Sequence, residues 1–294
     1  MQNTIIEKPG WLDKKISLGQ YKELSSLFES LNLNTVCQQA ACPNMGECFG
    51  SGVAAFLILG KICTRACRFC AIKKAKPEAV DYDQPGRVSQ AVRRLDLRHV
   101  VITSVTRDDL SDGGAEMFSR TISCIKELGR DIKIEVLVPD FKARIESIKK
   151  VIDAGPDIFS HNLETVDRLY KQVRTDADYK RSLAVLDAAK RINSDIYTKS
   201  GLMLGLGETE SEVLDALFDL RKIGCDFLSL GQYLAPSQKH FPVKEYISPD
   251  KFKWYKEQAF KLGFLHAECG PYVRSSYLAS QYMPAEVGKG VYLG

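Results

Sequence analysis

Long hydrophobic runs and a surplus of charge of either sign are both missing from this sequence. No apolar segment approaches the roughly 20 residues needed to cross a bilayer, and the opening stretch MQNTIIEKPGWLDKK lacks the hydrophobic centre of a signal peptide. The 41 basic and 37 acidic residues give a net charge of +4, too even a balance to indicate nucleic-acid binding. We therefore expect a cytoplasmic protein without a membrane or nucleic-acid partner. Its 294 residues, 45% of them hydrophobic, suffice for one large enzyme core.

Cysteine, in contrast, is plentiful. In a reducing compartment, nine cysteines indicate metal binding rather than disulfides. Six of them form two triplets, Cys37-x4-Cys42-x5-Cys48 and Cys63-x3-Cys67-x2-Cys70. A four-iron, four-sulfide (4Fe-4S) cluster needs four ligands, so each triplet leaves one iron free to bind a small molecule or to release sulfide. The pattern predicts two such clusters that take part in chemistry.

The second triplet reads Cys63-Thr-Arg-Ala-Cys67-Arg-Phe-Cys70, which is the signature of radical S-adenosylmethionine enzymes. In such enzymes an electron from the cluster breaks a carbon-sulfur bond of S-adenosylmethionine, and the protein aims the resulting radical. The alternative is a zinc site with a distant fourth ligand. Zinc sites usually combine a CxxC pair with a second pair or with histidines, and His161, His240 and His266 have no such spacing.

After this triplet, short apolar runs alternate with amphipathic stretches, which indicates repeated βα units. We expect six strands, at residues 54–59, 99–104, 132–138, 158–162, 197–204 and 227–233, and helices that include 113–128, 208–222 and 248–262. The fold class is therefore α/β, a partial (β/α)6 TIM-type barrel. The cysteine loop follows the first strand, where such barrels place reactive residues. The expected divisions are an N-terminal extension (1–52), the barrel core (53–247) and a C-terminal closing segment (248–294).

Other candidate cofactor-binding residues follow later strands. Gly113 and Gly114 open a helix and leave room for a zwitterionic ligand, although a plain turn is the alternative. Gly205 and Gly207 form a similar but weaker pattern. Asn162 and Glu164 have the chemistry to bind ribose hydroxyls, and a capping role is their alternative. Three cysteines remain: Cys124 and Cys225 are expected to be buried apolar residues, and Cys269 either structural or close to the first triplet.

Over nearly its whole length the sequence resembles the lipoyl synthases. The matching segments include KPGWL from Lys8, both triplets, VTRDD from Val105, HNLETV from His161, SGLMLGLGE from Ser200 and the tetrapeptide RSSY from Arg274. The joint presence of the first triplet and RSSY makes the resemblance specific. The sequence differs from the family pattern at Phe49, where the family commonly has tryptophan, and in the segment that follows Phe49. It also differs at Leu278, where histidine is frequent.

The resemblance implies that sulfur is inserted at carbons six and eight of an octanoyl chain, which is amide-linked to a lysine of a carrier domain. The carrier would be the glycine cleavage H protein or a 2-oxoacid dehydrogenase E2 domain, and the electron donor a flavodoxin or ferredoxin. It further implies that Cys63, Cys67 and Cys70 hold the cluster that cleaves S-adenosylmethionine. Cys37, Cys42, Cys48 and Ser276 would hold an auxiliary cluster that supplies the sulfur.

A serine oxygen holds iron less firmly than a thiolate does, which suits a cluster that loses iron, but a surface-loop serine is the alternative for Ser276. Two other functions remain open. One is a different radical sulfur-inserting enzyme, similar to biotin synthase or to a methylthiotransferase, and the other is a non-catalytic iron-sulfur protein.

Overall fold

The computed structural model describes residues 7–13, 26–35, 42, 44, 47–48 and 53–282. Within these residues eight strands form one curved sheet, in the order β1-β2-β5-β6-β7-β8-β9-β10. Their bounds are β1 (Asn34–Thr35), β2 (Val53–Ile58), β5 (His99–Ser104), β6 (Lys133–Leu137), β7 (Ile158–Ser160), β8 (Tyr197–Leu204), β9 (Phe227–Gln232) and β10 (His266–Gly270). All neighbouring pairs are parallel except β1 with β2. A separate two-stranded sheet pairs β3 (Ile62–Cys63) with β4 (Lys73–Lys74).

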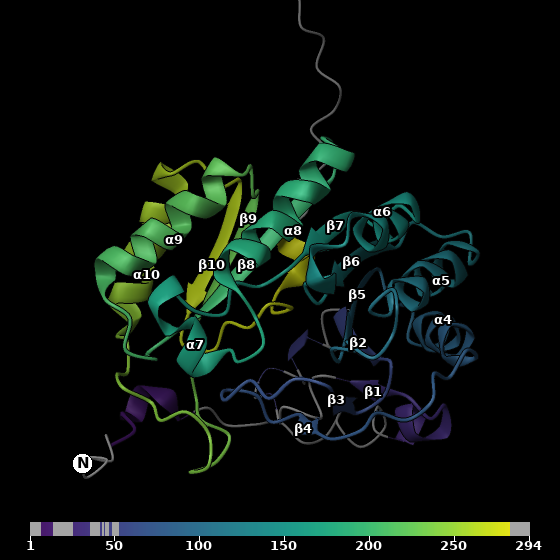
Figure 1. Cartoon of the computed structure of the whole chain (residues 1–294), viewed down its shortest axis with the longest axis horizontal. Helices are drawn as coiled ribbons and strands as arrows, with labels where there is room; N and C mark the ends of the chain where they lie inside the picture. Colours follow the sequence, from purple (N-terminus) through teal and green to yellow (C-terminus); the bar gives the residue numbers. More distant parts are fainter. Residues whose placement is uncertain are drawn as a thin grey trace, which may run out of the picture.

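Helices alternate with the parallel strands and surround the sheet (Figure 1). The described α-helices are α4 (Gln84–Arg94), α5 (Ala115–Lys126), α6 (Ile145–Asp153), α7 (Tyr170–Val173), α8 (Tyr179–Ile192), α9 (Glu210–Lys222) and α10 (Pro249–Lys261). Short 3-10 turns are η1 (Gly10–Leu12), η2 (Phe141–Ala143), η3 (Asp167–Leu169) and η4 (Ala279–Gln281). The start of α10 is as expected: the Ser248 hydroxyl accepts from the Lys251 amide, and Pro249 is the first helical residue.

The prediction of an α/β partial barrel is confirmed. The six expected strands correspond to β2 and β5 through β9, with ends that differ by no more than two residues. The sheet also contains β1 and β10, which the sequence did not indicate. β10 comes from the expected C-terminal segment and pairs in register with β9 along its whole length.

Successive residues of a strand face opposite sides of the sheet. Val100 and Ile102 of β5 pack in the main core under the helices, whereas Val101 between them belongs to a small inner cluster with Val53, Ala55 and Ala279. The inner face thus contacts the C-terminal segment. Farther along that segment, Tyr282 packs on Phe227, the first residue of β9, with ring centroids 5.6 Å apart.

A buried ion pair lies on the same inner face. The Lys199 Nζ atom is 3.1 Å from Glu135 Oε2, and it also lies 3.6 Å from the centroid of the Tyr282 ring. Ser160 donates to the same carboxylate. Because charges buried in this way need partners, this group fixes how the C-terminal segment fills the inside of the barrel.

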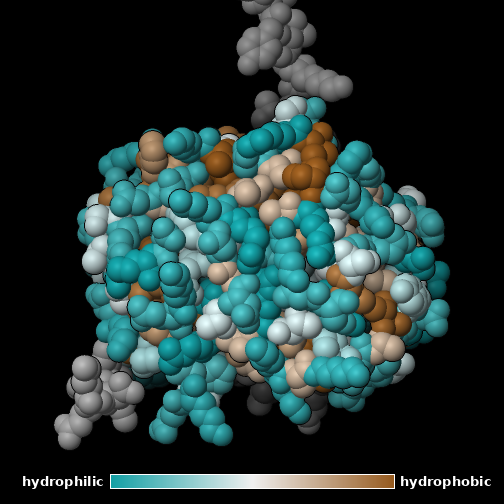
Figure 2. All heavy atoms as spheres, viewed as in Figure 1, coloured by the Kyte–Doolittle hydropathy of each residue, from teal (hydrophilic) through white to brown (hydrophobic). Residues whose placement is uncertain are grey.

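Hydrophilic side chains predominate on the face of the molecule drawn in Figure 2, where the apolar ones form separate patches. Among the described residues, no helix combines the length and the hydropathy that a membrane span requires.

Candidate functional site

The loop with Cys63, Cys67 and Cys70 is fastened to the sheet by hydrogen bonds from distant parts of the chain. The Thr64 hydroxyl donates to the Thr106 carbonyl at 3.0 Å, and the Thr175 hydroxyl donates to the Ala66 carbonyl at 2.7 Å. Farther along, the Arg68 amide donates to Val173 and its carbonyl accepts from the Phe241 amide, both at 2.8 Å. These contacts come from segments after β5, β7 and β9, so the loop lies at the carboxyl edge of the sheet, as expected.

A buried arginine is the firmest anchor of this loop. Arg65, only 6% exposed, donates to both oxygens of Asp108 and to both oxygens of Asp140 at 2.7 to 2.8 Å. Burial alone would lower the pKa of Arg65, but its hydrogen bonds to the two carboxylates outweigh burial and raise it. These contacts join the cysteine loop to the segments that follow β5 and β6.

The three thiols lie close enough together to influence one another. Burial raises the pKa of the Cys67 thiol to about 12 and that of the Cys70 thiol to about 11, and in both cases the Cys63 thiol raises it further. All three are partly exposed. In the part of the chain that the structure describes, no three His, Cys, Asp or Glu side chains converge on a single-ion site.

Asn162 and Glu164, the residues expected to bind ribose, lie beside one another past the end of β7. The Asn162 amide nitrogen donates to Glu164 Oε1 at 3.1 Å and to the Ser275 hydroxyl at 2.5 Å. The other side-chain atom of Asn162, its Oδ1 oxygen, is buried and accepts no hydrogen bond from described residues. A buried acceptor without a donor is unfavourable, so this oxygen fits a ligand hydroxyl or amine.

Glu164 combines backbone strain with an unusual electrostatic environment. Its φ angle of 68° lies in the left-handed region, and its backbone hydrogen bonds to Gly201 and Met203 of β8 hold it there. Burial raises the pKa of the Glu164 carboxyl, whereas Arg174 and Asn162 lower it. Strain of this kind often marks a functional position, and the role of Glu164 in binding the cofactor stays a prediction.

Arg174 and the imidazole of His161 were not among the expected site residues. Arg174 Nη1 donates to the Asn162 carbonyl at 2.9 Å and to the Ser182 hydroxyl at 3.0 Å, and its charge lowers the pKa of Cys67. The His161 Nδ1 atom is 2.8 Å from the Val138 carbonyl, so Nδ1 carries the proton. Burial lowers the pKa of His161 to about 3, and the ring is neutral near pH 7. No local sequence pattern identifies Arg174 as a site residue, because its side chain reaches the site from the end of α7.

The predicted glycines adopt backbone angles that other residues disfavour. At Gly114, a φ of +94° strains any residue with a side chain, and an added Cβ atom would also press on the tip of the Leu59 side chain, so this position favours glycine. At Gly205, with φ +95°, a Cβ atom would meet the Glu245 carbonyl oxygen at 2.3 Å. The Glu208 carboxylate closes the turn after β8 by accepting from the Gly205 and Leu206 amides. Backbone angles and packing thus explain Gly114 and Gly205, while cofactor binding by Gly113, Gly114, Gly205 and Gly207 stays a prediction.

The first triplet lies only partly within the described residues, because Cys37 is outside them. Cys42 and Cys48 pack against the inner cluster that contains Ala279. Between and beside them, Asn44 Nδ2 donates to the Tyr272 carbonyl at 2.5 Å, and Glu47 Oε1 accepts from the Tyr277 hydroxyl at 2.9 Å. The described part of this triplet therefore contacts the RSSY segment, some 230 residues away along the chain.

The leftover cysteines differ in their surroundings. Cys225 is buried, as expected, but the expectation for Cys124 is wrong, because its side chain is only partly buried at the edge of α5. Cys269 packs against the main core on the helix side of β10, and burial raises its pKa to about 12. Because its position is on that side, Cys269 is a structural residue.

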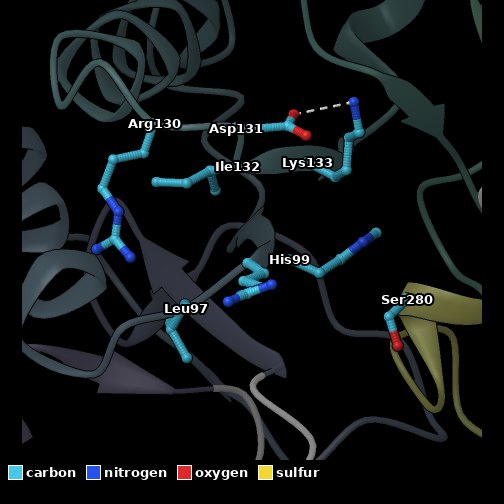
Figure 3. A pocket seen from close by; sticks show the side chains of 8 residues that line it. Leu97, His99, Arg130, Asp131, Ile132, Lys133 and Ser280 are labelled. Carbon is cyan, nitrogen blue, oxygen red and sulfur yellow. Dashed lines mark ion pairs between the residues drawn. The ribbon is translucent and has the colours of Figure 1, made fainter.

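A cavity of about 430 Å³ lies elsewhere (Figure 3). Its lining includes His99 and Lys133, which begin β5 and β6, as well as Ser280; the Lys133 ammonium pairs with Asp131 at 3.1 Å. Because the cysteine loop lies at the opposite ends of these strands, this cavity is not part of the site.

Comparison with known proteins identifies the family. The model of the radical SAM superfamily matches residues 57–220. The lipoyl synthase of Caldicellulosiruptor saccharolyticus is 54% identical over 276 residues, covering 94% of this chain and 97% of the relative. The chain belongs to the lipoyl synthase family. The lipoyl synthase of Geotalea daltonii is likewise 54% identical over 278 residues, covering 95% of this chain and 94% of that relative.

Solved structures support the fold. Methylornithine synthase superposes with a TM-score of 0.55 at 15% identity, covering 81% of this chain and 72% of that chain. At such low identity the likeness concerns the fold alone. Membership of the family makes this protein a radical S-adenosylmethionine enzyme with iron-sulfur chemistry.

Proposed function

We propose that this protein inserts two sulfur atoms, at carbons six and eight, into an octanoyl chain amide-linked to a lysine of a lipoyl-carrier domain. The observation that carries this proposal is the contact between the segment of the first triplet and the C-terminal segment: Asn44 donates to the Tyr272 carbonyl just before RSSY, and Glu47 accepts from Tyr277 within it. These bonds hold the segment of Cys42 and Cys48 against the segment that contains Ser276, as joint ligation of one auxiliary cluster would require.

The residues around the cysteine loop fit S-adenosylmethionine and a 4Fe-4S cluster. Cys63, Cys67 and Cys70 would hold the cluster, which when bound supplies the electron that splits the cofactor. Asn162 offers a buried acceptor oxygen, Glu164 a carboxyl group, and Arg174 a cation near both. These side chains would orient the cofactor, and Gly113, Gly114, Gly205 and Gly207 would line its approach.

A second 4Fe-4S cluster would be held by Cys37, Cys42, Cys48 and Ser276 and would provide the sulfur. Within this arrangement Ser275 fastens the segment to Asn162, so the two halves of the site share one hydrogen bond. Tyr277, which donates to Glu47, keeps the segment over the inner face of the sheet. The carrier would be the glycine cleavage H protein or a 2-oxoacid dehydrogenase E2 domain, and the reductant a flavodoxin or ferredoxin.

The decisive experiment is mass spectrometry of an octanoylated carrier peptide after anaerobic incubation with reconstituted protein, S-adenosylmethionine and dithionite. We expect a product with two added sulfur atoms. The Cys63→Ala/Cys67→Ala/Cys70→Ala variant should form no 5′-deoxyadenosine, because no thiolate remains to hold its cluster. The Cys37→Ala/Cys42→Ala/Cys48→Ala variant should still form it but yield no sulfur-containing product. A methylthiolated or singly thiolated final product would instead favour another radical sulfur-inserting enzyme.

A further inference from the structure

The cysteine loop and the strands beside it form a strongly basic surface. Residues 61–77 contain six basic side chains and no aspartate or glutamate. One of these, Arg65, is buried and neutralised by Asp108 and Asp140. The other five are exposed and make up what is called here the basic loop surface: Lys61, Arg68, Lys73, Lys74 and Lys76. This concentration is high for a chain whose overall net charge is only +4.

These charges lie next to the cluster ligands. Lys74 is the register partner of Cys63 in the β3–β4 sheet, and Arg68 stands between Cys67 and Cys70. Figure 1 shows β3 and β4 at the lower edge of the molecule, away from the helices that surround the main sheet. A protein that approached this edge would therefore come close to the three thiols, which are themselves partly exposed.

The positive charge is not neutralised locally. Lys61, Lys73, Lys74 and Lys76 form no ion pair with any described carboxylate, and Arg68 contacts the Gln172 carbonyl and the Phe241 ring instead. Elsewhere exposed lysines do find partners, as Lys149 does with Asp153. Glu78, which follows the segment, and Asp176, beside the Thr175 that binds Ala66, are the acidic groups at its border. Against the five exposed cations, these two carboxylates leave an excess of three positive charges.

We propose that the basic loop surface is the docking site of a small acidic electron-transfer protein that reduces the cluster held by Cys63, Cys67 and Cys70. This inference rests on the proposed function, because radical formation requires one electron per cofactor cleaved. The reduced donor loses that electron, and the carbon-sulfur bond of the sulfonium breaks to give methionine and a 5′-deoxyadenosyl radical. Redox encounters have small, transient interfaces, in which complementary charge sets the association rate.

The test compares two triple charge reversals. Lys73→Glu/Lys74→Glu/Lys76→Glu alters the basic loop surface, whereas Lys222→Glu/Lys253→Glu/Lys261→Glu alters exposed, unpaired lysines of α9 and α10 by the same net charge. Formation of 5′-deoxyadenosine is measured with a reduced acidic flavodoxin as donor and, separately, with dithionite. The reported quantity is the ratio of the flavodoxin-driven to the dithionite-driven rate, so that damage to the cluster cancels.

We expect the loop variant to lower this ratio at least about tenfold at low salt, through a higher KM for flavodoxin. The difference between this ratio in the loop variant and in the wild type should become smaller as the salt concentration rises from about 0.05 M to 0.5 M, because the Debye length shortens to a few ångströms. The control should keep the wild-type ratio. Lys61→Gln/Lys76→Gln, which leaves β4 intact, should lower the ratio less but in the same direction.

Three results would overturn the proposal. The first is an equal fall of the ratio in the α9/α10 control. The second is a higher KM for the octanoylated carrier with an unchanged KM for flavodoxin, which would assign the surface to the carrier. The third is an unchanged ratio in both loop variants. The proposed function is judged separately, since dithionite-driven sulfur insertion by the wild-type protein does not depend on this surface.

Discussion

Replacement of Arg65 by alanine should destabilise both the fold and the cysteine loop. The substitution removes four hydrogen bonds to two carboxylates. It leaves Asp140, whose side chain is fully buried, with Arg181 as its remaining cationic partner at 2.7 Å. Breaking a buried ion pair by removing one partner costs about 3 to 5 kcal/mol. Because Arg181 stays and Asp108 is 24% exposed, we expect a loss of about 3 kcal/mol, at the lower end of that range.

Two further variants separate the contributions of Arg65. Arg65→Lys keeps the charge but has only three donors on one nitrogen, so it cannot satisfy both carboxylates in the same geometry. Its stability should fall between wild type and Arg65→Ala. Arg120→Ala is the matched control, because Arg120 pairs with Glu116 through a side chain that is 50% exposed. Exposed pairs of this kind contribute less than about 1 kcal/mol.

The assay is urea unfolding of the cluster-free protein, with midpoints compared at equal m-values, followed by iron determination after reconstitution. Arg65→Ala should lower the midpoint and retain less iron per chain, since the loop loses its connection to the segments after β5 and β6. A variant with the wild-type midpoint and full iron content would refute the view that this network positions the thiols.

The strands that the sequence predicted are those buried on both faces. A parallel strand covered by helices and by an inner segment reads as an almost continuous apolar run, as Val53–Ile58 does. β10, with the sequence HAECG, has only one fully buried residue and therefore gives no such run. β1 consists of two residues and forms only through its pairing with β2. The hydrophobic pattern of the sequence alone could not have predicted either β1 or β10.

Site residues could be predicted where they lie together in one short segment, but not where the site depends on contacts between segments far apart in the sequence. The spacing of Cys63, Cys67 and Cys70 indicates a cluster without any structure. The contribution of Arg174 arises because α7 returns to the carbonyl of Asn162, and the approach of Tyr277 to Glu47 joins residues at opposite ends of the chain. Only the resemblance to lipoyl synthases, through RSSY, connected those two ends in advance.

Two remaining predictions concern His161 and Ser276. The pKa of His161 is about 3 in the folded protein against 6.5 in the unfolded chain, so only the unfolded state gains this proton between those values, and stability falls as the pH decreases. At about 1.4 kcal/mol per pH unit, the difference in unfolding free energy between wild type and His161→Gln should decrease by about 3 kcal/mol from pH 7 to pH 4. Urea unfolding measures this difference, and a difference that stays constant with pH would contradict the prediction. Ser276 lies between Ser275, which binds Asn162, and Tyr277, which binds Glu47, so its backbone is held where the first triplet meets RSSY. Since a thiolate holds iron more firmly than a serine oxygen does, Ser276→Cys should keep cofactor cleavage but lose sulfur insertion, whereas Ser194→Cys, at an exposed serine far along the chain, should retain both. If Ser276→Cys and Ser276→Ala both give doubly thiolated product at the wild-type rate by mass spectrometry, Ser276 does not bind the auxiliary cluster, and the neighbouring Ser275 becomes the better candidate.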